Sequence, residues 1–321
     1  MATIRYGDDT FELAEDESVL DGLTRRGIAI PSGCRSGICQ TCMMRALTGA
    51  PPVAAQQGLN ESLRQQGYFL ACTCYPEQSM RVALPDEAHV RLSATVERVE
   101  RLSADIMQVT LLCHGNLLYR PGQFIHLYRN EILSRSYSLA SVPELDEGLH
   151  LHVKRIAQGK VSAWVHDELK PGQQVEVQGA MGDCFYTPGD RELSLLLIGT
   201  GSGLAPLYGI ARDALHHGHR GEIRLYHGSG VMDGLYLMDE LRALQEQHIN
   251  FTYIPCLSQQ ALSGFRSGRA HDLALADQPD LKNWKVFLCG HPEMVNSARK
   301  KSFLAGASFQ DIYADAFVVA Q

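Results

Sequence analysis

Cysteine spacing constrains this chain more than any other feature of its sequence. Cys34, Cys39 and Cys42 are separated by four and two residues, and Cys72 and Cys74 follow further along. A [2Fe–2S] cluster suits this spacing, because one compact loop brings three thiolates around two irons and a distant cysteine supplies the fourth. Either Cys72 or Cys74 could be that fourth ligand. Tetrahedral zinc is the alternative, but zinc sites usually pair their cysteines in two short hairpins, and only one is present.

The other bulk features narrow the class of protein. The nine cysteines are an odd number and five of them lie within residues 34–74, which indicates metal binding in a reducing compartment rather than a disulfide framework. No apolar run approaches about 18 residues and no secretion signal is present, so we expect a cytoplasmic protein without a membrane span. The net charge of −7 argues against a nucleic-acid partner, because phosphate binding needs a basic face.

Three sequence textures follow one another along the 321 residues, which predicts three domains. Short alternating segments and one short helix flank the cysteine loop. Strand-length runs separated by Gly and Pro turns then predict a small antiparallel β-barrel. Apolar strands that alternate with helices follow, which predicts a parallel α/β domain. We place the domains at residues 1–89, 90–191 and 192–321. The expected helices are 16–26, 205–216 and 236–247, and the expected strands are 3–13, 79–84, 92–99, 106–112, 124–128, 149–154, 174–178, 195–198, 223–226, 251–255 and 286–288.

A tetrapeptide after a strand-like segment of the predicted barrel has side chains that suit a flavin. It offers a guanidinium for the pyrophosphate, an aromatic ring for the isoalloxazine and a small hydroxyl for the polar edge of that ring. The tetrapeptide resembles the flavin motif of the ferredoxin-NADP⁺ reductase superfamily. That resemblance implies FAD as the flavin, with contacts from Arg135, Ser136, Tyr137 and Ser138 and a catalytic role for Ser138.

Residues 153–162 resemble the second flavin-phosphate motif of the same superfamily. Residues 159–162 are expected to open a helix whose first N–H groups face an anionic phosphate. An exposed barrel edge is the alternative for Lys154. The implied flavin contacts are Val153, Lys154, Gly159, Lys160, Val161 and Ser162.

A glycine-rich run directly follows the apolar strand 195–198 and precedes a predicted helix. Such a strand–turn–helix unit presents backbone N–H groups to a nucleotide pyrophosphate. Pro206 replaces the last glycine of the ordinary dinucleotide fingerprint, and the run instead resembles the nicotinamide-domain motif of the superfamily. The expected nucleotide contacts are Gly199, Thr200, Gly201, Ser202, Gly203 and Pro206.

The segment Cys289-Gly290-His291-Pro292-Glu293-Met294 follows the last predicted strand. In the superfamily, a Cys-Gly pair at this place lies at the nicotinamide. The resemblance therefore implies that Cys289 contacts the reactive ring and has a catalytic role, with further contacts from Gly290, Pro292 and Met294. One more buried small residue is the alternative for Cys289.

The segment Tyr313-Ala314-Asp315-Ala316-Phe317 brings an aromatic and a carboxylate to the place where members of the superfamily return the chain to the flavin. We expect Phe317 to lie at the flavin face, as a catalytic and cofactor-binding residue. Packing of a final strand in the core is the alternative.

Residues 31–42, followed later by Leu70-Ala71-Cys72, look like the ferredoxin domain of the ferredoxin–flavin reductases. The resemblance implies a β-grasp fold for the N-terminal domain. The spacing in that family selects Cys72 as the fourth ligand beside Cys34, Cys39 and Cys42.

The domain order resembles the reductase components of bacterial aromatic-ring dioxygenases and of soluble di-iron monooxygenases. It implies electron transfer from NADH through FAD and the [2Fe–2S] cluster to a partner oxygenase component. Residues 226–234 lack a basic side chain for a 2′-phosphate, which favours NADH, although Arg266 or Arg269 could reach one. The same electron path could serve a deoxysugar dehydratase. A redox sensor is the alternative outside the enzymes, and it would not need the nucleotide motifs.

Overall fold

The computed structural model describes residues 2–85, 91–189 and 191–317. The chain separates into two compact units, residues 1–90 and residues 91–321. The first domain boundary expected from the sequence falls among residues outside the described ranges. No helix in the described part of the chain is long and apolar enough to cross a membrane.

The first unit is a five-stranded mixed sheet with one main helix, α1. Ser18 caps this helix, since its hydroxyl accepts from the Asp21 N–H at 3.1 Å, so the helix begins three residues later than the sequence predicted. Val19, Leu20 and Leu23 are buried against the sheet, as their spacing indicated. The strand order is β2-β1-β5-β3-β4. The elements are β1 (Thr3–Tyr6), β2 (Asp9–Glu12), α1 (Val19–Arg25), β3 (Met43–Thr48), η1 (Val53–Gln56), α2 (Glu61–Gln65), β4 (Tyr68–Leu70), η2 (Ala71–Thr73) and β5 (Met80–Ala83).

The second unit begins with six antiparallel strands in the order β10-β7-β6-β11-β8-β9. An isolated antiparallel bridge between Leu139 and Leu151 joins the two edges of this sheet, so it curls into the expected barrel. Alternate side chains such as Val109, Leu111 and Val177 fill the interior. The elements are β6 (Arg91–Arg101), β7 (Ile106–Cys113), β8 (Phe124–Asn130), β9 (Leu133–Ser138), β10 (Leu149–Lys154), α3 (Lys160–Asp167) and β11 (Gln174–Met181).

One strand of the barrel differs from the sequence prediction. Residues 135–138 were expected after a strand, but they form the second half of β9 and pair with β8, with Tyr137 opposite Ile125. Arg135 and Ser136 broke the alternation of apolar residues on which the prediction depended. Both side chains line a cavity, so the hydrophobic pattern is absent where the strand has a binding role.

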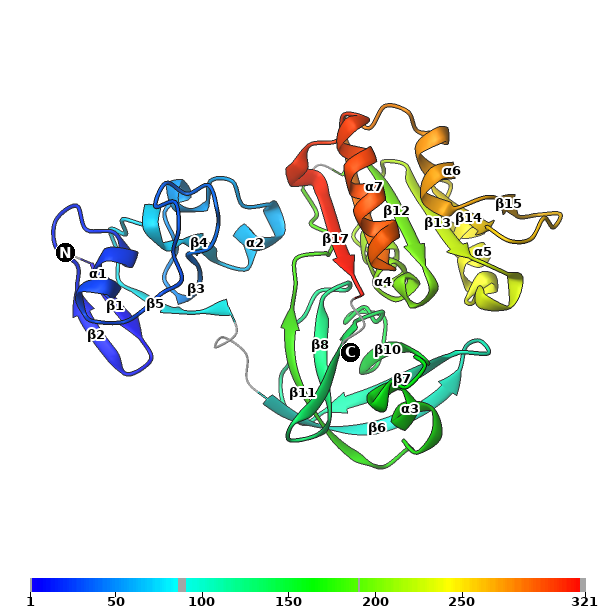
Figure 1. Cartoon of the computed structure of the whole chain (residues 1–321), viewed down its shortest axis with the longest axis horizontal. Coiled ribbons are helices and arrows are strands. Elements are labelled where there is room, and N and C mark those ends of the chain that lie inside the picture. The colour runs from blue at the N-terminus through cyan, green and yellow to red at the C-terminus, as the bar shows by residue number, and fades with distance from the viewer. Residues whose placement is uncertain (1, 86–90, 190, 318–321) are drawn as a thin grey trace. The chain divides into compact units, whose positions relative to one another are not determined.

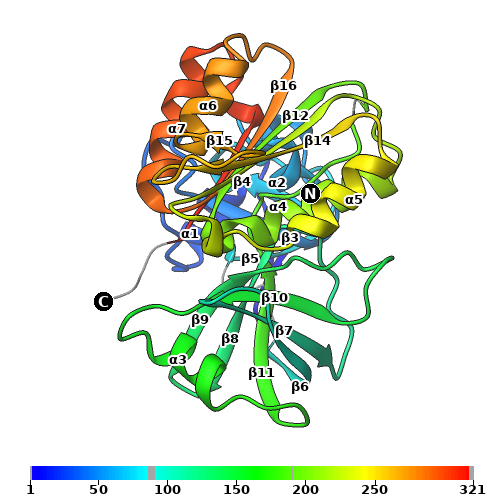
Figure 2. The same ribbon diagram turned by 90° about the vertical axis from the view of Figure 1, so that its right-hand side faces the viewer.

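The second unit continues with six parallel strands in the order β15-β14-β13-β12-β16-β17. Figures 1 and 2 show these strands stacked on the barrel, with helix α4 between the two. The elements are β12 (Ser194–Thr200), η4 (Gly201–Gly203), α4 (Leu204–His216), β13 (Ile223–Ser229), η5 (Met232–Gly234), α5 (Met238–Gln247), β14 (Phe251–Leu257), β15 (Arg266–Ser267), α6 (Ala270–Asp277), β16 (Trp284–Gly290), α7 (Pro292–Leu304), η6 (Phe309–Asp311) and β17 (Ile312–Ala316).

Both faces of the parallel sheet are buried. Leu195 and Leu197 pack on the α4 and α5 side, whereas Leu196 and Ile198 pack on the α6 and α7 side. The chain leaves β12 toward β13 on one flank, and β16 pairs with the other flank of β12. In open parallel sheets, ligands bind at the carboxyl ends of the strands where the order reverses in this way.

Candidate functional site

The cysteine site lies in the loop between α1 and β3 and at η2. Cys34 and Cys39 are exposed, whereas Cys42 and Cys72 are buried. Backbone N–H groups point at the outer sulfurs: those of Ser36 and Cys39 lie 3.4 and 3.3 Å from the Cys34 Sγ. Such N–H groups stabilise negative charge on sulfur and tune a cluster.

The environment of the thiols divides them into an outer pair and an inner pair. Hydrogen bonds from Ser36 and Cys39 lower the pKa of Cys34 to about 5, and those from Cys34 and Thr41 lower the pKa of Cys39. Burial raises the pKa of Cys42 to about 11, and this thiol lies beside Cys72. A [2Fe–2S] cluster takes two cysteine thiolates on each of its two irons, so an outer and an inner pair suit it.

Cys74 lies at the end of η2, two residues after Cys72. Its side chain is fully buried in the core of the first unit, and its carbonyl accepts from the Val19 N–H at 2.9 Å. Burial raises the pKa of the Cys74 thiol to about 12. These contacts favour Cys72 as the fourth ligand.

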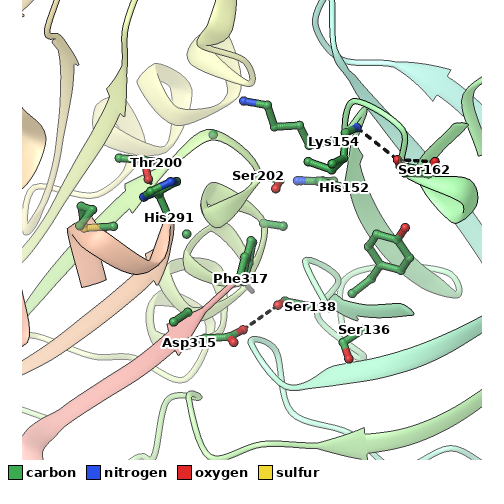
Figure 3. A pocket seen from close by; sticks show the side chains of 18 of the residues that line it. Ser136, Ser138, His152, Lys154, Ser162, Thr200, Ser202, His291, Asp315 and Phe317 are labelled. Carbon is green, nitrogen blue, oxygen red and sulfur yellow. Dashed lines mark hydrogen bonds between the residues drawn. The ribbon is translucent and has the colours of Figure 1, made fainter. Parts of the chain in front are cut away.

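The second unit contains a cavity of about 1310 Å³ that both of its sheets line. The barrel contributes β9, β10 and the start of α3, and the parallel sheet contributes the carboxyl ends of β12, β13, β16 and β17. Figure 3 shows side chains from the two halves facing one another across this space. Its basic side chains are Arg135, Lys154, Lys160 and Arg269, and its acidic ones are Glu293 and Asp315. This excess of positive charge suits the phosphates of two nucleotides.

All four residues of the tetrapeptide on β9 line the cavity. The Arg135 guanidinium donates to the Ser134 carbonyl at 2.8 Å, and the Ser136 hydroxyl lies 3.1 Å from the His126 Nδ1. Burial raises the pKa of Tyr137, so its phenol stays neutral. The aromatic ring and the guanidinium lie on the same cavity wall, as flavin binding requires.

The second barrel segment is divided between the core and the cavity. The Val153 side chain packs inside the barrel, whereas Lys154, next along β10, lines the cavity and pairs with Asp105 at 3.2 Å. Helix α3 begins at Lys160, after Gly159. The Ser162 hydroxyl accepts from the Ile156 N–H at 3.1 Å and donates to the Gly159 carbonyl at 3.2 Å, which fixes this turn. Gly159, Lys160, Val161 and Ser162 all line the cavity, as predicted for a phosphate at a helix start.

The glycine-rich run is divided in the same way. Thr200, Gly201 and Ser202 line the cavity. A side chain at Gly201 would meet the Lys154 Nζ at 3.4 Å, so Lys154 of the barrel stands beside the nucleotide turn. Gly199, Gly203 and Pro206 are not among the lining residues: a Cβ at Gly199 would meet Leu207, and Pro206 is buried in the first turn of α4. Their contact with the nucleotide stays a prediction.

Gly203 offers a steric test of this turn. Its φ of −63° suits alanine, but a Cβ would overlap the Cys289 carbonyl oxygen of β16 and lie 2.7 Å from the Gly290 Cα. We expect Gly203→Ala to lower the free energy of unfolding by about 3 kcal/mol, the upper range for overpacking, and to weaken nucleotide binding. The matched control, Gly172→Ala, adds a Cβ in open space at φ +88° and should cost only about 1 kcal/mol. Chemical denaturation measures both, and equal losses would contradict the steric account.

Cys289 directly precedes Gly290 of the cavity wall. It is the penultimate residue of β16, is fully buried, and has its Sγ 3.7 Å from the Cys184 Sγ. Its thiol belongs to the core on the α4 side, and its contact with the nicotinamide stays a prediction. Gly290 and Met294 line the cavity, whereas Pro292 occupies the first turn of α7, away from the wall.

A carboxylate at the cavity floor was noted in the sequence but was given no partner there. The Ser138 hydroxyl of β9 donates to Asp315 Oδ2 of β17 at 2.8 Å, and Figure 3 shows the two side chains meeting. Burial raises the pKa of Asp315. Phe317 also lines the cavity, and its N–H donates to the Gly290 carbonyl at 2.8 Å. Ser138 and Asp315 are 177 residues apart in the sequence, so only the fold brings them together.

One further cavity residue, His152, had no signal in the sequence. His152 lies on β10 two residues before Lys154 and contacts the Tyr236 hydroxyl through Nδ1 at 3.2 Å. Burial lowers the pKa of His152 to about 3, so the ring is neutral. Arg269 precedes α6 and lines the cavity, whereas Arg266 is held by Asp277 through bonds of 2.8 and 3.0 Å.

A barrel with a flavin-type cavity, a parallel sheet with a nucleotide turn and a separate cysteine loop define a flavin-dependent, iron–sulfur electron-transfer oxidoreductase. Family models agree with each part. Residues 4–77 match the 2Fe-2S iron-sulfur cluster binding domain, residues 93–186 the oxidoreductase FAD-binding domain and residues 197–300 the oxidoreductase NAD-binding domain.

Whole-chain comparisons extend this agreement. The reductase subunit of an aromatic O-demethylase from Amycolatopsis is 32% identical over 92% of each chain. The ferredoxin–NAD(P)⁺ reductase component of a naphthalene 1,2-dioxygenase system from Pseudomonas putida is 28% identical over 94% of this chain and 93% of its own. The crystal structure of an Amycolatopsis cytochrome P450 reductase superposes over 99% of both chains with a TM-score of 0.70 and 30% identity.

The chain therefore belongs to the three-domain ferredoxin–FAD–NAD(P)H reductases of the ferredoxin-NADP⁺ reductase superfamily. Its cofactors are a [2Fe–2S] cluster, FAD and a nicotinamide nucleotide. The predicted fold classes of all three parts are confirmed.

Proposed function

We propose that this reductase takes electrons from NADH and delivers them singly to a partner oxygenase component. One observation carries the donor half of this proposal: flavin-type and nucleotide-type walls enclose a single cavity, with the Ser138–Asp315 hydrogen bond crossing between them. FAD supplies the needed chemistry, because it accepts two electrons together and releases them one at a time. The residues of the chain then have to bind, orient and shield that group.

The proposed flavin contacts are those of the predicted motifs that line the cavity. Tyr137 offers its ring, Arg135 its charge, and α3 its first N–H groups for a phosphate. Thr200, Gly201 and Ser202 are the proposed contacts for the nucleotide pyrophosphate, and Gly290 and Met294 for its nicotinamide end. Phe317 is the proposed residue at the flavin face. We keep Cys289 in this proposal as a residue of the supporting layer beneath Gly290.

Cys34, Cys39, Cys42 and Cys72 are the proposed cluster ligands. The exposed outer pair gives an acceptor protein access to one edge of the cluster. Thiolate ligands need reducing surroundings before the cluster is loaded, which supports the cytoplasm as the compartment.

The proposed acceptor is an oxygenase component, and we favour a haem oxygenase of the cytochrome P450 type. The O-demethylase reductase subunit and the cytochrome P450 reductase are relatives at 32% and 30% identity, and each aligns with more than nine-tenths of this chain. The test is NADH-driven reduction of a purified P450 by the cofactor-loaded protein under carbon monoxide, where the reduced haem complex absorbs. A naphthalene-dioxygenase-type component is the comparison acceptor. Faster transfer to that component would contradict the P450 assignment, and no transfer to either would contradict the oxygenase proposal.

NADH is the proposed donor because the end of β13 has no basic side chain for a 2′-phosphate and Arg266 is held by Asp277. We expect kcat/KM for NADH to exceed that for NADPH by at least about tenfold, roughly 1.4 kcal/mol of discrimination. Steady-state assays with both nucleotides check this. Arg269→Ala, which removes a basic side chain from the cavity, should leave NADH turnover nearly unchanged and widen the preference. A preference for NADPH in the unaltered protein that Arg269→Ala abolishes would overturn the assignment.

A further inference from the structure

Helix α4 connects the nucleotide turn to the barrel. It begins directly after η4, so its first residues continue the glycine-rich turn. Nine residues along, Arg212 lies on the side of the helix that faces the barrel. Because an α-helix is a rigid element, a shift at Arg212 moves the turn at the start of the helix.

Helix α4 approaches the backbone of the barrel closely at Gly209. A Cβ on Gly209 would lie 3.0 Å from the Ala140 carbonyl and 3.2 Å from the Leu139 carbonyl. Leu139 directly follows Ser138, the last residue of the flavin tetrapeptide. The helix therefore packs against the segment that directly follows the flavin motif.

An ion pair fixes this contact. The two terminal nitrogens of the Arg212 guanidinium, Nη1 and Nη2, donate to the two carboxylate oxygens of Asp146 at 2.7 and 2.8 Å. The side chains are only 15% and 11% exposed, so solvent weakens the pair little. Asp146 also accepts from the Val142 N–H at 2.7 Å, and the Arg212 guanidinium lies 5.0 Å from the Tyr208 ring centre.

Asp146 has a specific place in the barrel. It lies in the connection between β9 and β10, the two strands that carry the flavin-type motifs. The Asp146 carboxylate accepts hydrogen bonds from the Val142 N–H of the same barrel turn and from Arg212 of α4. The ion pair therefore joins the flavin strands to the helix that positions the nucleotide turn.

We propose that Arg212 and Asp146 are positioning residues that set the separation between the nucleotide turn and the flavin strands. This inference rests on the proposed donor half-reaction. Transfer between two bound rings needs reacting atoms about 3–3.5 Å apart, and a displacement of about 1 Å can cost on the order of 100-fold in rate. Neither residue lines the cavity, so their effect is on geometry and not on binding contacts.

The test uses the FAD- and cluster-loaded full chain with Asp146→Asn, Arg212→Lys and the uncharged pair Asp146→Asn/Arg212→Gln. Anaerobic rapid mixing with NADH gives the rate of flavin bleaching, the dissociation constant for NADH and the long-wavelength absorbance of the stacked rings. NADH deuterated at the transferred position gives the isotope effect. Arg220→Gln is the matched control, because Arg220 pairs with Glu192 in an ion pair that is 70% and 60% exposed.

For Asp146→Asn we expect a decrease of roughly 10- to 100-fold in the flavin reduction rate and a larger isotope effect. The dissociation constant for NADH, the flavin content and the melting temperature should change little in at least one of the three variants. Arg212→Lys should be intermediate, since it keeps the charge but loses the two-point geometry. A normal rate in a folded, flavin-loaded variant would overturn the inference, as would a rate loss that only follows flavin content. Failure of NADH to bleach the flavin of the unaltered protein would instead refute the proposed donor half-reaction.

Discussion

Cys72→Ala is expected to abolish reduction of one-electron protein acceptors while ferricyanide reduction by NADH continues through the flavin. A cluster that loses one of its four thiolates is not retained, so the fall should be at least about 100-fold, beyond the roughly 10- to 100-fold typical of losing an outer partner. The readouts are bound iron, the visible spectrum of the cluster, and the two activities measured on the same sample.

Cys74→Ala is the matched control two residues away. It removes a fully buried sulfur from the core of the first unit, so it should cost about 1–2 kcal/mol of stability and leave the iron content intact. Loss of iron in Cys74→Ala together with retention in Cys72→Ala would reverse the ligand assignment. Loss in both variants, with a normal melting temperature, would mean that the site needs the sulfur of Cys74 as well.

Asp315→Asn is expected to lower flavin reduction by NADH by roughly 10- to 100-fold, the effect of losing a hydrogen bond to a charged group worth about 1.5–3 kcal/mol. The Ser138 hydroxyl would lose its carboxylate acceptor and its fixed direction at the cavity floor. Asp239→Asn, at an exposed position on α5, is the control and should change nothing.

Stability provides an independent readout of the same variant. Burial raises the pKa of Asp315 in the folded protein, so at pH values between the unfolded and folded pKa the folded state holds a proton that the unfolded state releases. The protonated carboxyl therefore favours folding below the ordinary aspartate pKa of about 3.9, and this contribution is lost as pH rises through the raised folded value. Asp315→Asn removes that dependence. Its melting temperature near neutral pH should equal or exceed that of the unaltered protein, and a clear decrease would contradict a buried, costly carboxylate.

Local spacing in the sequence was enough to predict the three domain types but not the contacts between segments that are distant in the sequence. Three cysteines in one loop, a tetrapeptide and a glycine-rich turn each carry their chemistry within a few residues, so the three domain types were correctly predicted. The fourth cysteine depended on family resemblance, because Cys72 and Cys74 are two residues apart and both buried, and only the fold places Cys72 beside Cys42.

The direction of single side chains was harder to predict. Adjacent residues of a strand face opposite sides, so Lys154 reaches the cavity while Val153 fills the barrel, and Gly290 lines the wall while Cys289 lies behind it. Contacts between distant segments were beyond reach. The Ser138–Asp315 hydrogen bond and the Arg212–Asp146 ion pair join residues 177 and 66 positions apart, and no periodicity encodes such a meeting.

The central claim is that one chain converts paired electrons from NADH into single electrons at an iron–sulfur cluster. Anaerobic titration of the fully loaded protein with NADH, followed by visible absorbance and electron paramagnetic resonance, tests it most directly. FAD takes two electrons and the cluster one, so about one and a half equivalents of NADH should complete the reduction and give the resonance of a reduced [2Fe–2S] cluster. Bleaching of the flavin after about one equivalent, with a cluster that stays oxidised on further NADH but is reduced by dithionite, would contradict the account.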